Sequence, residues 1–167
     1  MDKRLTEDDL QKLRDLPYKT PFLERLLAER CSLDDDFHQH LLQITAPKAM
    51  AYNAIMVRFN GDPSGIEFST KDRQKWAFVL PDASEPGRHR IQYFDERSFF
   101  SHHPYDTVTE AVLAMVTEGY EIEDAGALDR VSATETWRKG TAVAAIKMKL
   151  DRGLISWKEF TELAESA

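Results

Sequence analysis

The chain has 167 residues and a formal net charge of −7, with 22 Lys and Arg against 29 Asp and Glu. Hydrophobic residues make up 42% of it and include nine Phe, five Tyr and three Trp, which excludes whole-chain disorder and allows an ordinary core. The single cysteine, Cys31, excludes an intramolecular disulfide and is typical of a reducing compartment. No apolar run resembles a signal peptide or a membrane span, so we expect a cytoplasmic protein without membrane contact.

Residues 1–60 are expected to form a group of short helices. Thr6 and Thr20 are predicted N-caps, and the second precedes Pro21 at the first helical position. The apolar stripe predicted for the second helix consists of Phe22, Leu23, Leu26 and Leu27.

A third helix is predicted to begin after Ser32, with acidic residues 34–36 in its first turn, where the helix dipole favours negative charge. Its predicted buried face consists of Phe37, Leu41 and Ile44. Residues 46–59 fit either helix or strand.

The turn sequence NGDPSG at 60–65 ends this region, and the apolar residues then alternate with the period of a β-strand. A loop at 81–87 and a turn at 95–98 separate three alternating runs, the last of which is predicted to span 99–103 and to end at Pro104. In the first run, one predicted face carries Trp76, Phe78 and Leu80 and the other carries Ala77 and Val79. In the second run, one predicted face carries His89, Ile91 and Tyr93 and the other carries Arg90, Gln92 and Phe94. This pattern predicts an antiparallel β-meander of three to four strands.

A helix over 108–118 is predicted from both of its ends. Thr107 and Glu110 fit a capping box, and Gly119 fits the left-handed position that follows a helix. The apolar residues between them fall at helical spacing and are Val108, Ala111, Val112, Met115 and Val116.

The last part of the chain is predicted to be a helical hairpin. An acidic connector at 121–129 precedes a helix over 134–150, for which a break near Gly140 is left open. Ser156 and Glu159 form another capping box. The final helix is predicted to bury Trp157, Phe160 and Leu163.

These elements predict an α+β fold with a helical N-terminal region at 1–60, a meander with one packed helix at 61–120, and the hairpin at 121–167. We expect the three parts to form one compact unit.

Neither a metal site nor a cofactor site is predicted. His38 and His40 lie two positions apart on a predicted helix, so they cannot face one ion together with Cys31. No glycine-rich phosphate loop and no nucleophile elbow is present. His102 and His103 lie on a predicted strand and point to opposite faces, so they cannot act together at one site. One of them could still form an acid–base pair with Asp106, and a small hydrolase is therefore an alternative function.

A second alternative is nucleic-acid binding. The meander followed by a helix that begins with Thr-x-x-Glu is similar in topology to three-stranded DNA-reading modules of the AP2 and integrase arm-binding type. That similarity implies a binding face on the strands. The polar residues expected on that face are Arg88, Arg90, Gln92, Arg97 and His102.

The function expected first is non-enzymatic binding of a protein partner. Residues 1–46 carry seven Lys or Arg against ten Asp or Glu, and residues 106–167 carry seven against twelve. Complementary charge favours encounter with a basic protein, whereas nucleic-acid affinity depends on neutralising phosphates. We therefore expect an inhibitor or adaptor that occludes its partner, such as an immunity protein or an anti-CRISPR-like counter-defence protein of a phage or mobile element. The predicted partner-binding residues are Glu121, Glu123, Asp124, Arg90, Arg97 and His102.

Overall fold

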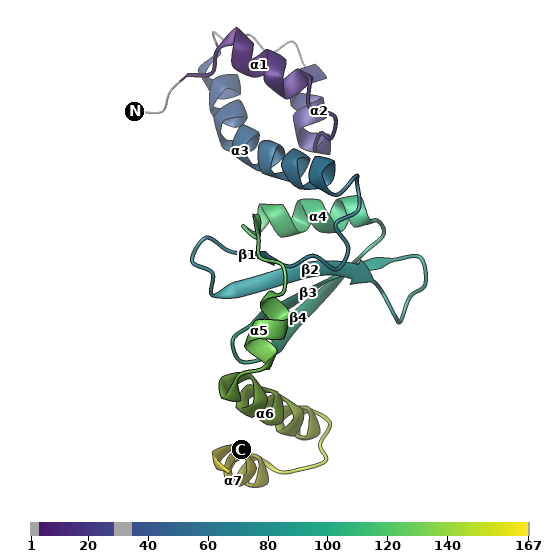
Figure 1. The fold of residues 1–167 in the computed structure, drawn as a ribbon, viewed down its shortest axis with the longest axis vertical. Coiled ribbons are helices and arrows are strands. Elements are labelled where there is room, and N and C mark those ends of the chain that lie inside the picture. Colours follow the sequence, from purple (N-terminus) through teal and green to yellow (C-terminus); the bar gives the residue numbers. More distant parts are fainter. Residues whose placement is uncertain (1–3, 29–34, 167) are drawn as a thin grey trace.

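The structure is a computed structural model that describes residues 4–28 and 35–166. It is an α+β fold in three tiers along one long axis (Figure 1). Three helices form one end, a five-stranded sheet with one covering helix forms the middle, and three further helices lead to the other end. The predicted fold class is confirmed.

The N-terminal tier consists of α1 (Glu7–Arg14), α2 (Pro21–Ala28) and α3 (Asp36–Arg58). Thr6 caps α1 in a full capping box with Asp9, and the hydroxyl of Thr20 accepts from the backbone N–H of Leu23 at 3.1 Å. Both predicted caps are confirmed. The predicted cap Ser32 lies outside the described residues, and α3 takes Asp35 as its N-cap instead.

The helix α3 is not short, because it spans 23 residues and includes the whole of 46–59. Its predicted buried face is wrong for Phe37 and Ile44, which are 66% and 55% exposed, whereas Leu41 is partly buried and packs against the N-terminal core. The face that packs on α1 and α2 is offset around the helix and carries small residues, so the neighbouring helices can approach closely. The residues of α3 that enter this core are Leu42, Ala46 and Ala49, and they meet Leu10, Leu13, Leu23 and Leu26.

The sheet has the strand order β4-β3-β2-β1-β5, and all of its pairs are antiparallel. The strands are β1 (Phe68–Ser69), β2 (Lys75–Pro81), β3 (His89–Asp95), β4 (Phe99–Tyr105) and β5 (Ile122–Glu123). The predicted meander is β2-β3-β4, and its predicted alternation is confirmed by the pairing register. The two-residue strands β1 and β5 were not predicted, and β5 lies in the segment expected to be a connector.

Pro104 does not end the third strand of the meander, as the sequence predicts, because β4 continues through it to Tyr105. Pro104 pairs with Arg90 at the edge of the sheet. Edge strands tolerate proline since a missing N–H that faces away from the neighbouring strand breaks no ladder hydrogen bond.

One face of the sheet is covered by α4 (Val108–Thr117) (Figure 1). Thr107 accepts from the backbone N–H of Glu110 at 3.1 Å, which confirms the predicted N-cap. Gly119 has φ +94° and the backbone N–H of Tyr120 donates to Met115, which confirms the predicted C-terminal glycine. The side chains that form this core across α3, the sheet and α4 include Tyr52, Ile55, Phe68, Ala77, Val79, Ile91, Tyr93, Val112 and Met115.

The opposite face is covered over part of its area by α5 (Ala127–Ser132) and the start of α6 (Glu135–Asp151). The rings of Trp76 and Phe94 stack there, with 5.6 Å between the ring centres. The helix α6 runs through Gly140 without a break. A Cβ atom at Gly140 would lie 2.3 Å from the carbonyl oxygen of Arg97, so the helix needs glycine to approach the β3–β4 turn.

The C-terminal hairpin of α6 and α7 (Trp157–Glu165) is confirmed, as is the capping box of Ser156 and Glu159. The predicted burial is wrong for Trp157 and Leu163, which are 69% and 44% exposed. All residues of the two helices are described, and none of them is buried. The hairpin lies at the end of the long axis, away from both larger cores (Figure 1), and its outer apolar side chains are exposed in the described part of the chain.

Candidate protein-binding surfaces

The three predicted acidic residues of the connector are all ion-paired within the chain. Glu121 lies 3.5 Å from Nζ of Lys71, and Glu123 lies 2.6 Å from Nε of Arg58. These contacts tie β5 to the rest of the sheet and to the end of α3. The expectation that Glu121 and Glu123 bind a partner stays a prediction.

Asp124 is the most enclosed of the three, with a side chain 16% exposed. It accepts a hydrogen bond from Nε1 of Trp76 at 2.8 Å and pairs with Nη2 of Arg130 at 2.6 Å. Burial opposes ionisation of Asp124, but the Trp76 hydrogen bond and the Arg130 ion pair outweigh it and hold its pKa below the usual value. Asp124 therefore fastens α5 to the sheet, while its predicted role in partner binding is untested.

Of the predicted basic residues, the structure brings Arg90 and His102 together. Their strands pair as Gln92 with His102 and Arg90 with Pro104, so the two side chains lie on the same sheet face. Arg97 lies in the β3–β4 turn against α6 and does not join them. Asp82 interacts electrostatically with both Arg90 and His102. Gln92 lies on the same face as Arg90 and His102, and Arg88 is paired with Glu85 and Asp106. The nucleic-acid alternative stays a prediction.

The two histidines diverge across β4, as the sequence predicts. His103 lies on the α4 side, with its ring 5.7 Å from that of Tyr93 and its Nε2 atom 3.3 Å from the hydroxyl of Ser101. Asp106 pairs with Nε of Arg88 at 3.0 Å. Both histidines are exposed, and neither lines any of the main cavities found among the described residues. These cavities therefore give the hydrolytic alternative no support, and it stays a prediction.

Within residues 4–28 and 35–166, no group of three or more His, Cys, Asp or Glu side chains has the arrangement of a metal site. Cys31 lies outside these ranges. His38 instead contacts the N-cap of α3, with its Nδ1 atom 3.0 Å from a carboxylate oxygen of Asp35. No helix in the described part of the chain is long and apolar enough to cross a bilayer.

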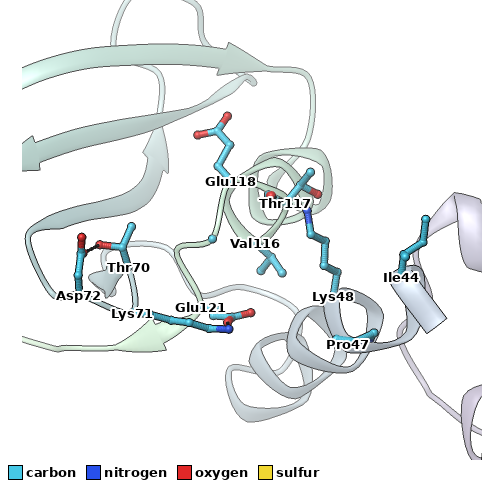
Figure 2. A pocket seen from close by; sticks show the side chains of 11 residues that line it. Ile44, Pro47, Lys48, Thr70, Lys71, Asp72, Val116, Thr117, Glu118 and Glu121 are labelled. Carbon is cyan, nitrogen blue, oxygen red and sulfur yellow. Dashed lines mark hydrogen bonds and ion pairs between the residues drawn. The ribbon is translucent and has the colours of Figure 1, made fainter. Parts of the chain in front are cut away.

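A cleft of about 590 Å³ lies where α3, the end of α4 and the β1–β2 turn meet (Figure 2). Nζ of Lys48 reaches across from α3 and donates to the carbonyl oxygen of Thr117 at 2.8 Å, where it satisfies the end of α4. On the other side, Lys71 pairs with Glu121. Both lysines that line the cleft are thus engaged by the chain itself.

Of the three carboxylates at the cleft, Glu121 is paired with Lys71, which leaves Asp72 and Glu118 without an ion pair among the described residues. Asp72 accepts from the hydroxyl of Thr70 at 2.6 Å, and this hydrogen bond is the main cause that lowers the pKa of Asp72 below its usual value. Glu118 is exposed at the end of α4 and makes no ion pair with any described residue. The cleft therefore carries net negative charge.

A second hollow of about 400 Å³ shares Ile44, Lys48 and Thr117 with the cleft and extends along α3 to Phe22. The two hollows adjoin at these residues, where Lys48 and Thr117 are hydrogen-bonded, and we call the two together the α3 groove. Its α2 end is apolar, since Ile44 is half-exposed and Phe22 is 41% exposed. Sequence reasoning missed this groove because it placed Ile44 and Phe22 in the core.

No protein-family model matches the chain, and comparisons with curated proteins and with solved structures find no significant match.

Proposed function

We propose that this protein is a non-enzymatic protein-binding module that acts as an inhibitor or adaptor and holds its partner in the α3 groove. One observation carries the proposal: exposed apolar side chains, Ile44 and Phe22, line the same groove as a set of carboxylates. A contiguous exposed apolar patch on a folded domain is typical of an interaction site, and Phe22 and Ile44 line the same hollow.

The chemistry of the groove favours a partner segment with an apolar side chain next to a Lys or Arg. The apolar side chain would lie against Ile44, and the cation would face Asp72. Of the two lysines in the groove, Lys71 is paired with a carboxylate, that of Glu121, whereas Lys48 donates to the neutral carbonyl oxygen of Thr117 and keeps its charge. A net charge of −7 would speed the encounter with such a basic partner.

An inhibitory role follows from occlusion. A protein that covers a basic surface prevents that surface from meeting nucleic acid or another acidic ligand. Immunity proteins and the counter-defence proteins of phages and mobile elements act in this way, and this setting fits the charge and the size of the chain.

Two substitutions on the same helix test the proposal. Ile44→Asp places a charge in the groove, and Val57→Asp places one on an α3 residue that is 51% exposed and lines none of the main cavities. We expect Ile44→Asp to weaken the affinity for the partner about tenfold or more, as loss of an interface anchor does. Val57→Asp is expected to leave this affinity unchanged. The measurement is affinity capture from the native host with and without nuclease, followed by titration of the captured protein.

Three results would contradict the proposal. Equal binding by both variants would place the contact outside the α3 groove. Capture that disappears after nuclease treatment would favour the nucleic-acid alternative, and no captured protein at all would remove the basis for a binding module.

A further inference from the structure

Two turns at one end of the sheet enclose a hollow that is separate from the α3 groove. The β1–β2 turn forms one side of it and the β3–β4 turn forms the other, where β2 begins and β3 ends. Its volume is about 420 Å³, which falls in the usual range for small-molecule sites. We call it the turn hollow.

Three cations line the turn hollow without an ion pair. Arg73, Lys75 and Arg97 are exposed, and none of them pairs with an acid in residues 4–28 or 35–166. The Nζ atom of Lys75 lies 6.0 Å from the centre of the Phe100 ring instead. Like charges that line one space repel each other, so an anion between them would lower the free energy.

Two carboxylates also line the turn hollow, and one of them is engaged by its own turn. Asp95 lies opposite Lys75 in the strand register, but its Oδ1 atom accepts from the backbone N–H groups of Arg97 and Ser98, at 2.7 and 3.1 Å. Glu96 is the other carboxylate. Cations therefore outnumber acids in the lining by three to two.

Two further carboxylates lie near the turn hollow but do not line it. Asp72 interacts electrostatically with one of the three cations and Asp124 with another. Asp72 already accepts from the hydroxyl of Thr70 at 2.6 Å. Asp124 already accepts from Trp76 and pairs with Arg130. Each of these carboxylates thus has another partner, and the cations of the hollow remain open to a ligand.

The backbone at Arg73 is strained, which indicates that its side chain has a role. Its φ of +54° lies in the left-handed region, which is costly for a residue with a long side chain. Among the described residues, the other non-glycine residue with positive φ is Asn60, and asparagine enters this region more readily. Glycine or asparagine would form the β1–β2 turn at lower cost, and strain of this kind is typical of binding sites.

The turn that carries Arg97 is held on two sides. Its backbone N–H is bound by Asp95, and its carbonyl oxygen lies so close to Gly140 that a Cβ atom there would be 2.3 Å away. The helix α6 thus supports this turn from outside the hollow. A site whose backbone is fixed before the ligand arrives loses less entropy on binding.

We propose that the turn hollow binds a phosphate group, with Arg73, Lys75 and Arg97 as the donors. A phosphate monoester carries a charge of about −1.5 to −2 near pH 7 and has three acceptor oxygens, so one such group can engage all three cations. Guanidinium groups match phosphate oxygens two at a time. The phosphate belongs either to a free molecule of the size of a nucleotide or to the backbone of a nucleic acid, and both present the same oxygens.

Isothermal titration calorimetry of the full chain at low salt tests this site with three probes: pyrophosphate, ATP and a single-stranded oligonucleotide. We expect binding that weakens about tenfold or more in Arg73→Asn and in Arg97→Ala, as loss of a charge-assisted hydrogen bond does. Arg152→Ala is the matched control, because Arg152 is also exposed and unpaired among the described residues but does not line the hollow.

The three probes also identify the source of the phosphate. Tighter binding of the oligonucleotide than of ATP assigns the site to nucleic acid, and the reverse assigns it to a free molecule. No binding of any probe, or binding that either hollow variant leaves at native strength, overturns the inference.

Arg73→Asn has a second readout, which a purely structural role would not produce. Because asparagine adopts the left-handed region more readily, we expect this variant to unfold at a higher urea concentration than the native chain while it binds the probe more weakly. A variant that is less stable than the native chain would mean that Arg73 supports the fold, and it would overturn its role as a donor to the ligand.

The inference and the proposed function can fail separately, because Ile44 lines the α3 groove and not the turn hollow. We expect Ile44→Asp to bind the phosphate probes at native strength. A chain that captures a protein through Ile44 but binds no probe overturns only the phosphate site. A chain that binds a probe through Arg73 and Arg97 but captures no protein overturns only the proposed function.

Discussion

Gly140 is the residue on which the contact between α6 and the β3–β4 turn depends. Two physical effects oppose each other at this position. Alanine is the better helix former by about 1 kcal/mol, but its Cβ atom would lie 2.3 Å from one backbone atom of Arg97 and 2.8 Å from another. Backbone atoms cannot swing aside as a flexible side chain can, so the steric effect outweighs helix propensity.

Gly140→Ala is therefore expected to destabilise the fold by about 1–3 kcal/mol, the usual cost of overpacking. Chemical unfolding followed by tryptophan fluorescence measures this loss of stability, because Trp137 lies on α6 and the centre of its ring is 5.2 Å from that of Phe99. Thr141→Ala, at an exposed position of the same helix, is the control and is expected to be neutral or slightly stabilising. Equal stability of the two variants would show that α6 does not depend on this contact.

Asp124 adds a pH dependence to the same region. Its pKa in the folded chain is lowered from 3.8, so the folded state favours the ionised form. The stabilisation is fully present above about pH 4 and is lost as pH falls through the folded-state value. Asp124→Asn keeps an acceptor for Trp76 but removes the charge that pairs with Arg130.

We expect Asp124→Asn to cost about 1–3 kcal/mol near pH 7, as the loss of a hydrogen bond to a charged group does. The difference from the native chain should shrink as the pH falls below about 4, because the unfolded chain then takes up a proton at Asp124 that the folded chain does not, and it disappears once the pH passes the folded-state pKa. Urea unfolding at several pH values measures it, with the exposed Asp129→Asn as control. A difference that stays constant down to pH 3 would contradict the assigned role of the carboxylate.

At the scale of elements, the sequence predicts those features that depend on residues close together along the chain. The alternation in β2 and β3, and the caps at Thr6, Thr107 and Ser156, depend on residues a few positions apart, and all are confirmed. The strands β1 and β5 pair Phe68 with Glu123 across more than fifty residues and have only two residues each. No local pattern carries that information.

The helix α3 shows the same limit at its buried face. In its first half the helix offers two apolar stripes, and the one with Phe37 and Ile44 is left exposed. The stripe of Leu42, Ala46 and Ala49 is buried, and its two alanines allow the neighbouring helices to approach closely. Helical periodicity identifies both stripes, but only the position of the neighbouring helices selects one of them. The α3 groove was missed for this reason, although Glu121 on its rim was predicted as a contact residue.

At the scale of the whole molecule, α3 joins two cores that would otherwise be separate. Its first half packs through Leu42 and Ala46 into the core of the N-terminal helices, and its second half packs through Tyr52 and Ile55 into the core of the sheet. The helix is continuous over 23 residues. Loss of one core should therefore weaken the other, since the helix cannot unwind at one end without losing support at the other.

Leu42→Ala tests this coupling because Leu42 is fully buried in the N-terminal core, and its truncation is expected to cost about 2–5 kcal/mol. The three tryptophans are Trp76, Trp137 and Trp157, so fluorescence reports on the sheet and the hairpin, whereas circular dichroism reports on all helices. If the chain unfolds as one cooperative unit, the midpoints of both unfolding transitions should move to lower urea concentration together in the variant. A helical signal that is lost first, with the fluorescence transition unmoved, would mean that the N-terminal helices unfold independently. The α3 groove would then open without loss of the sheet, and partner binding would depend on the stability of the N-terminal helices alone.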